Sequence, residues 1–205
     1  MAKTPSTMVP LGTLAPDFAL PDTAATRAPD GSWPLVRRDD FAAAPALLVA
    51  FLCNHCPYVV HVRDRLSELV RQWQARGVAV VAISSNDPLG YPADAPDAMA
   101  EAARRFALPY PYLFDASQEV ALHYRAACTP DFFLYDGARR LAYRGQLDGS
   151  RPGNGVEVSG ADLGAAIDAV LSGRPAAEEQ RASLGCNIKW REENLVAGLP
   201  AYRGE

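Results

Sequence analysis

The stretch ALLVAFLCNHCPYVV at residues 46–60 decides the fold class of this chain. It opens with an unbroken apolar run, Ala46 to Leu52, which is typical of a strand covered on both faces. From Tyr58 to Trp73 the apolar residues instead recur at helical spacing, with charged residues on the other side. Two cysteines three positions apart, Cys53 and Cys56, therefore lie where a buried strand ends and an amphipathic helix begins.

The rest of the chain continues to alternate between strand-like and helix-like segments. Alternation of this kind implies parallel strands joined by helical crossovers, which predicts an α/β fold. Asp136-Gly137 between two apolar runs indicates a hairpin, and we expect Ser159 to cap the last helix. The predicted strands are 78–84, 112–114, 132–135 and 140–144, and the predicted helices are 97–106, 118–127 and 159–171.

Composition excludes several classes of protein. The chain has 205 residues, of which 49% are hydrophobic and 21% charged, enough for one domain with a core that needs no disulfides. A net charge of −4 without clustered basic residues argues against a nucleic-acid partner. No apolar stretch approaches the roughly 18 residues of a membrane span, and residues 1–11 lack a signal-peptide pattern. We therefore expect a cytoplasmic protein with reduced thiols and no membrane partner.

The position of Cys53-Asn54-His55-Cys56 predicts thiol chemistry. Free N–H groups and the positive end of the dipole at a helix N-terminus favour a thiolate, the species that attacks disulfides. We assign Cys53 as the nucleophile because we expect it nearer the helix start and the solvent, and Cys56 as the resolving thiol. Positive charge on His55 would make the pair more oxidising; the alternative is a solvent-exposed residue without that role.

Together, the strand, the CxxC motif, the helix and a later Thr129-Pro130 resemble the thioredoxin superfamily. The opening APDFAL at residues 15–20, with the extra loop and helix between the middle strands, resembles its alkyl hydroperoxide reductase/thiol-specific antioxidant (redoxin) branch, and GCNIKW at 185–190 resembles bacterial members without a defined substrate. The resemblance implies a thioredoxin-like fold, a central mixed sheet flanked by helices. It covers a redoxin domain at 9–173, with an N-terminal extension and a C-terminal arm at 174–205. It also implies that Pro130 is cis beside the redox pair, and that Thr129 offers backbone groups to substrate.

Two departures bear on the activity that the resemblance implies. Thioredoxins carry a buried acid six residues before the first cysteine, where this chain has Leu47. Peroxiredoxins place Pro and Thr/Ser where this chain has Ala46 and Ala50, so the hydroxyl that polarises a peroxide is missing. We therefore favour a thiol-disulfide oxidoreductase, with a peroxiredoxin-like peroxidase whose peroxidatic residue is Cys53 as the alternative.

The other cysteines leave two questions open. Cys128 is either a third redox thiol near the pair or a small buried hydrophobe, and Cys186 is interpreted as an inert thiol whose place cannot be read from the sequence. A copper- or zinc-binding protein is a further alternative, with Cys53, Cys56, Cys128 and either His55 or His61 as ligands. The usual structural-zinc spacing is absent, so we expect no metal site.

The predicted reaction is dithiol–disulfide exchange with a disulfide-containing protein or small molecule. It needs no bound cofactor. It does need a thiol electron donor, such as a thioredoxin or glutathione system.

Overall fold

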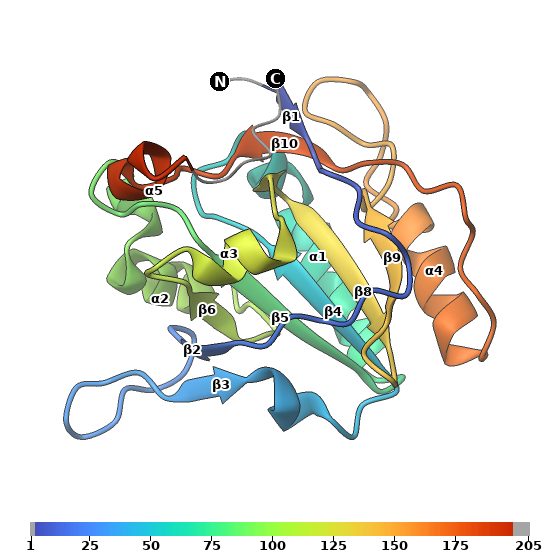
Figure 1. Cartoon of the computed structure of the whole chain (residues 1–205), viewed down its shortest axis with the longest axis horizontal. Coiled ribbons are helices and arrows are strands. Elements are labelled where there is room, and N and C mark those ends of the chain that lie inside the picture. The colour runs from blue at the N-terminus through green and yellow to red at the C-terminus, as the bar shows by residue number, and fades with distance from the viewer. Residues whose placement is uncertain (1–2, 199–205) are drawn as a thin grey trace.

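The computed structural model describes residues 3–198 and is built around a five-stranded sheet (Figure 1). Its strands are β4 (Ala46–Phe51), β5 (Val78–Ser84), β6 (Tyr112–Phe114), β8 (Asp131–Asp136) and β9 (Leu141–Gly145). They lie in the order β6-β5-β4-β8-β9. The strands β4, β5 and β6 run parallel, whereas β8 and β9 are antiparallel to their neighbours. The predicted central mixed sheet is confirmed.

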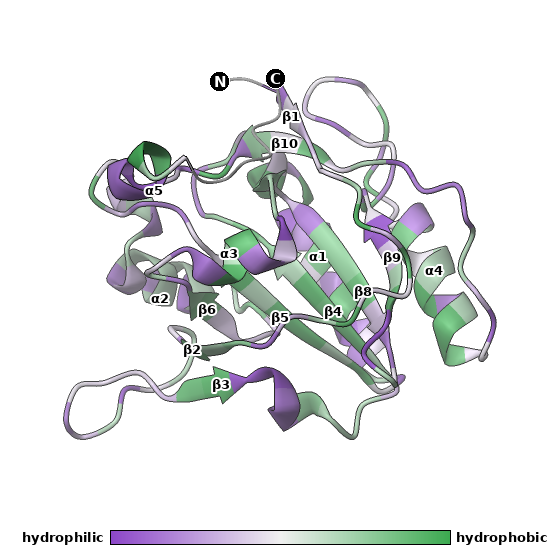
Figure 2. Ribbon diagram, in the orientation of Figure 1, coloured by the Kyte–Doolittle hydropathy of each residue, from purple (hydrophilic) through white to green (hydrophobic). Residues whose placement is uncertain are grey.

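Helices cover both faces of this sheet, as Figure 1 shows. They are α1 (Pro57–Gln74), α2 (Pro96–Arg105), α3 (Glu119–Tyr124) and α4 (Ala161–Leu171). Successive residues of a strand point to opposite faces. Accordingly, Leu48 packs with the apolar residues of α1, α2 and α4, while Val49 packs with those of α3. The central strands are mostly hydrophobic in Figure 2 because each is covered on both sides. Within residues 3–198, no helix is both long and apolar enough to cross a lipid bilayer.

A second, three-stranded sheet joins both ends of the chain to the segment before β8. It consists of β1 (Lys3–Pro5), β10 (Leu184–Asn187) and β7 (Cys128–Thr129), with β10 in the middle and both pairings antiparallel. A Cβ atom on Gly185 would lie 2.0 Å from the carbonyl oxygen of Thr129, so only glycine permits this approach of β10 to β7. The predicted C-terminal arm thus contributes a strand, followed by α5 (Glu192–Val196); its last residues, 199–205, lie outside the described residues.

The remaining regular segments are short, and most of them precede β4. They are the paired strands β2 (Ala19–Pro21) and β3 (Leu35–Arg37) and the 3-10 turns η1 (Arg38–Phe41) and η2 (Pro92–Asp94). These segments show no hydrophobic period, so the sequence did not reveal them.

The predicted cap of the last helix is wrong. The N-cap of α4 is Gly160, at φ 74°, and not Ser159. The carboxylate of Asp148 accepts the main-chain N–H groups of Ser159 and Gly160 at 2.7 and 2.6 Å. A distant aspartate therefore satisfies donors at this helix start, which a local capping pattern does not reveal.

Candidate redox site

The two cysteines of the CxxC motif lie at the junction of β4 and α1. Cys56 is the N-cap of α1, and Pro57 occupies the first helical position, where its missing N–H costs no hydrogen bond. The expectation that Cys53 lies nearer the helix start is therefore wrong. Nor is Cys53 open to solvent, because it is 2% exposed and Cys56 is 0% exposed. Both are reduced thiols.

Thr129 contacts both sulfurs. Its hydroxyl oxygen lies 3.3 Å from Cys53 Sγ, and its carbonyl oxygen lies 3.1 Å from Cys56 Sγ, whose thiol can donate to it. The Thr129-Pro130 bond is cis, as the resemblance implied. In β7, Thr129 is paired with Cys186 of β10. A substrate chain that used the same edge of Thr129 would therefore have to displace the arm.

Cys186 belongs to this site, although the sequence interpretation made it an inert thiol of unknown position. Its Sγ lies 2.9 Å from Cys56 Sγ. The two residues are 130 positions apart in the chain, and only the pairing of β10 with β7 brings them together. In the sequence, only the motif GCNIKW singled out this segment, and it did not indicate which residue Cys186 contacts.

Cys128 occupies the neighbouring strand position but makes different contacts. It pairs with Asn187, and its thiol points to the carbonyl oxygen of Pro130 at 3.7 Å. Burial is the main reason that the pKa of the Cys128 thiol lies well above its ordinary value. The contacts therefore agree with the small buried hydrophobe rather than with a third redox thiol.

Negative charge in the cysteine pair is most stable on Cys56. A hydrogen bond from Cys53, more than any other contact, lowers the pKa of Cys56 to about 4, and Cys186 adds a second donor. The same bond, followed by burial and the charge of Asp94, raises the pKa of Cys53. The thiol whose pKa is lowered is thus Cys56, at the N-cap, rather than Cys53, and hydrogen bonds from the two neighbouring thiols lower it more than the helix does.

A buried aspartate that the sequence did not single out holds His55. Asp94 accepts a hydrogen bond at Oδ2 from His55 Nδ1 at 2.6 Å, and the same oxygen accepts one from the side-chain amide of Asn86 at 2.7 Å. Its Oδ1 accepts the main-chain N–H of Asn54 at 2.7 Å. The imidazole stacks on Tyr91, with ring centroids 5.1 Å apart. His55 is therefore fixed in position and is only partly exposed.

One feature of the sequence could have pointed to Asp94 as a site residue. It lies in the loop that follows β5, and open α/β sheets gather functional groups at the carboxyl ends of their parallel strands. The Nε2 atom of His55 is buried and has no hydrogen-bond partner among residues 3–198. This leaves Nε2 able to accept a proton when Nδ1 donates to Asp94.

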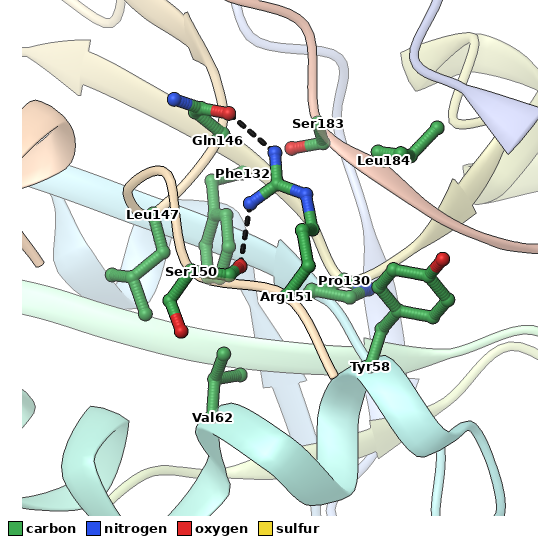
Figure 3. Close-up of a pocket in the computed structure, with 10 residues that line it drawn as sticks. All are labelled: Tyr58, Val62, Pro130, Phe132, Gln146, Leu147, Ser150, Arg151, Ser183 and Leu184. Carbon is green, nitrogen blue, oxygen red and sulfur yellow. Dashed lines mark hydrogen bonds between the residues drawn. The ribbon is translucent and has the colours of Figure 1, made fainter. Parts of the chain in front are cut away.

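A narrow pocket gives access to Cys53 from the side of α1 and α2. It has a volume of about 30 Å³ and is lined, among others, by Cys53, Arg63, Phe106 and Tyr112. A second pocket, of about 20 Å³, lies beside Pro130 and Tyr58 (Figure 3). Arg151 reaches across it and donates hydrogen bonds to the side chain of Gln146 and to the main chain. Of the four cysteines, Cys53 alone lines either pocket within the described part of the chain.

Known proteins match this arrangement over most of the chain. The AhpC/TSA family matches residues 11–144. The chain belongs to the AhpC/TSA family. Comparison with curated proteins gave no match.

Two solved structures are similar over nearly their whole length. A hypothetical protein from Sinorhizobium meliloti 1021 is 48% identical, with a TM-score of 0.86, covering 92% of this chain and 99% of that one. An uncharacterized conserved protein from Geobacillus kaustophilus is 45% identical, with a TM-score of 0.88 and coverages of 94% and 98%. A putative thiol:disulfide interchange protein DsbE from Chlorobium tepidum, at 22% identity and a TM-score of 0.59 over 80% of this chain and 99% of that one, shares the fold. The family match indicates a redox protein of the thioredoxin-like class, and the structural similarity at 22% identity shows the fold alone.

Within this AhpC/TSA chain, β4 supplies no acid or hydroxyl to the site. The positions that carry the thioredoxin acid and the peroxiredoxin Pro and Thr/Ser are Leu47, Ala46 and Ala50, all buried in the hydrophobic core. Any proton transfer at the cysteines must therefore use groups from other elements. The groups near Cys53 that could take part are the hydroxyl of Thr129 and the side chains of His55 and Asp94.

The structure also changes the set of possible metal ligands. Ligand atoms of Cys53, His55 and Asp94 all lie within 4.8 Å of one another. His61, an alternative ligand by sequence, instead hydrogen-bonds to Ser150 at 2.7 Å. A soft metal bound here would have Asp94 as a ligand in place of the predicted Cys56 and Cys128.

Proposed function

We propose that this protein is a thiol-disulfide oxidoreductase that uses Cys53 and Cys56 as its dithiol. The observation that carries the proposal is the contact of both sulfurs with Thr129 at the start of α1. Two thiols held together at a helix N-terminus can form a disulfide with little rearrangement, and the helix favours the anionic sulfur that exchange requires.

In the proposed first step, Cys53 attacks the substrate because it lines a pocket, whereas Cys56 is enclosed. The proton of Cys53 passes to the Cys56 thiolate as the Cys53 sulfur attacks a substrate disulfide. A mixed disulfide forms at Cys53, and the departing substrate sulfur takes up a proton from solvent. Cys56 therefore acts as the base for its partner.

In the second step, Cys56 loses its proton and attacks Cys53 Sγ, which forms the Cys53–Cys56 disulfide and releases the second substrate thiol. We propose that the unpartnered Nε2 of His55, with Asp94 on its other nitrogen, accepts this proton. This pair would do the work of the acid that Leu47 replaces. A thiol donor such as glutathione or a thioredoxin, both present in the predicted cytoplasmic location, would then reduce the disulfide.

The test is rapid mixing of the reduced full-length protein with oxidised glutathione, followed by mass spectrometry. We expect Cys56→Ala to accumulate a mixed disulfide on Cys53 and Cys53→Ala to accumulate none at that position. Cys128→Ala, which removes a buried thiol without a hydrogen bond to the pair, should behave like the wild type. Exchange at the wild-type rate in Cys53→Ala would overturn the assignment of the nucleophile.

Two parallel measurements separate the alternatives. Fast, saturable consumption of hydrogen peroxide beside slow disulfide exchange would show a peroxidase instead. Stoichiometric zinc or copper on the purified protein, lost in Asp94→Asn, would show a metal-binding protein. Neither result is expected from a dithiol oxidoreductase.

A further inference from the structure

The contact between Cys56 and Cys186 lies outside the CxxC motif. Cys186 is 1% exposed and its sulfur lies 2.9 Å from that of Cys56. A disulfide bond is about 2.05 Å long, so these sulfurs need to approach by only about 0.9 Å to become bonded. They are already in contact in the reduced protein.

Strand pairing on both sides holds Cys186 in this place. Cys186 is paired with Thr129 of β7 on one edge and with Lys3 of β1 on the other. Gly185 allows β10 to lie against the main chain of Thr129, as described above. A thiol on a loose tail would meet Cys56 only at times, whereas the middle strand of a sheet keeps it there.

We propose that Cys186 is a third redox thiol. By disulfide exchange within the chain, it replaces Cys53 as the bonded partner of Cys56. The site would then have two oxidised forms, with Cys53–Cys56 or Cys56–Cys186 bonded. This inference rests on the proposed function, because it begins from the disulfide that substrate turnover leaves behind.

The exchange step balances without any added oxidant or reductant. The Cys186 sulfur attacks Cys56 Sγ, the Cys56–Cys186 bond forms and the Cys53–Cys56 bond breaks. The proton of Cys186 passes to the departing Cys53 sulfur, so one thiol and one disulfide remain. Burial, followed by the hydrogen bond with Cys56, raises the pKa of Cys186 to about 12, so its attack requires that its proton leave for the departing Cys53 sulfur in the same step.

The transfer would return Cys53 to the thiol form while the protein as a whole stays oxidised. Cys53 lines the narrow pocket, so this is the sulfur that meets substrate or an oxidant first. The oxidised equivalent would move to a pair of sulfurs that are both buried. An oxidised protein would also have β10 bonded covalently to the start of α1.

Cys128 provides a matched control for Cys186. It is equally buried, and it lies in β7, directly before the Thr129 that faces Cys186. Its thiol points to the carbonyl oxygen of Pro130 instead of to Cys56. A general tendency of buried thiols to oxidise would involve Cys128, whereas the proposed exchange would not.

The experiment maps disulfides in the full-length protein. The protein is incubated with oxidised glutathione, quenched with acid at successive times, alkylated and digested at low pH, so that bonds do not reshuffle. We expect the Cys56–Cys186 peptide pair in the wild type. It should form much more slowly in Cys53→Ala, where the Cys53–Cys56 bond from which it arises cannot form. The pair should be lost in Cys186→Ala and unchanged in Cys128→Ala.

The outcomes separate this inference from the function on which it rests. Formation of Cys53–Cys56 in the wild type without any Cys56–Cys186 would overturn the third thiol and leave the oxidoreductase standing. Formation of Cys56–Cys186 at the wild-type rate in Cys53→Ala would overturn the transfer from Cys53. Formation of neither disulfide would overturn both. The wild-type map decides the question even if a variant fails to fold, which circular dichroism would reveal.

Discussion

Replacing Cys186 by alanine removes one of the hydrogen bonds that stabilise negative charge on Cys56. A hydrogen bond to a charged group contributes about 1.5–3 kcal/mol, and about 1.4 kcal/mol corresponds to one pKa unit. Loss of the donor should therefore raise the pKa of Cys56 by about 1–2 units from its value of about 4. Cys53→Ala should raise it further, because the bond from Cys53 is the largest single cause of the lowering.

The assay follows the ultraviolet absorbance of the thiolate against pH, with the alkylation rate of Cys56 as a second readout. Cys128→Ala serves as the control, since it makes no hydrogen bond to Cys56, and its titration should match the wild type. The reasoning fails if Cys186→Ala titrates like the wild type, or if the lowest midpoint moves with Cys128 instead. If Cys186→Ala raised the pKa of Cys56 more than Cys53→Ala did, Cys186 would be the stronger of the two hydrogen-bond donors.

Three further predictions concern stability, each measured by urea unfolding. Arg144 and Asp131 form a fully buried ion pair at 3.1 Å, so Arg144→Met should cost about 3–5 kcal/mol; a loss below 1 kcal/mol would show that the pair is dispensable. Burial raises the pKa of Asp131 to about 6, so the folded protein binds more protons between about pH 4 and 6. Unfolding free energy should therefore decrease by about 3 kcal/mol as pH rises through that window, a slope that Asp131→Asn should remove. Gly185→Ala forces a methyl group against the Thr129 carbonyl and should lower the free energy of unfolding by about 1–3 kcal/mol. Gly164→Ala, in open space on α4, should leave it unchanged or raise it. Equal effects of the two substitutions would refute the close approach of Gly185 to Thr129.

The elements with a clear hydrophobic period were predictable from the sequence. The run at Ala46–Phe51 and the helix that follows it appear where their patterns placed them, and so does the strand Tyr112–Phe114. These segments are buried on both faces or along one stripe, so their buried positions carry apolar residues in a recognisable pattern. These segments predicted an α/β fold, and the resemblance carried by the CxxC motif and Thr129-Pro130 implied that it is thioredoxin-like.

The parts of the site that sequence reasoning missed depend on long-range pairing. Cys186 meets Cys56 only because β10 lies between β1 and β7, and a four-residue strand has too few residues to show a period. Asp94 lies in a segment rich in proline and glycine, a composition typical of an exposed loop, so the sequence did not indicate that its carboxylate is buried. The charge distribution was missed for a related reason, because it depends on which sulfur receives hydrogen bonds and not on which cysteine comes first.

The position of β10 also bears on where this protein should be divided for expression. The AhpC/TSA match ends at residue 144, yet the strand that covers Cys56 begins at Leu184. A fragment cut at the family boundary would keep the CxxC motif and lose α4, the partner thiol and the strand that covers Thr129. Its reactivity would describe an uncovered pair of cysteines, so the smallest unit in which this chemistry can be studied runs from β1 to β10.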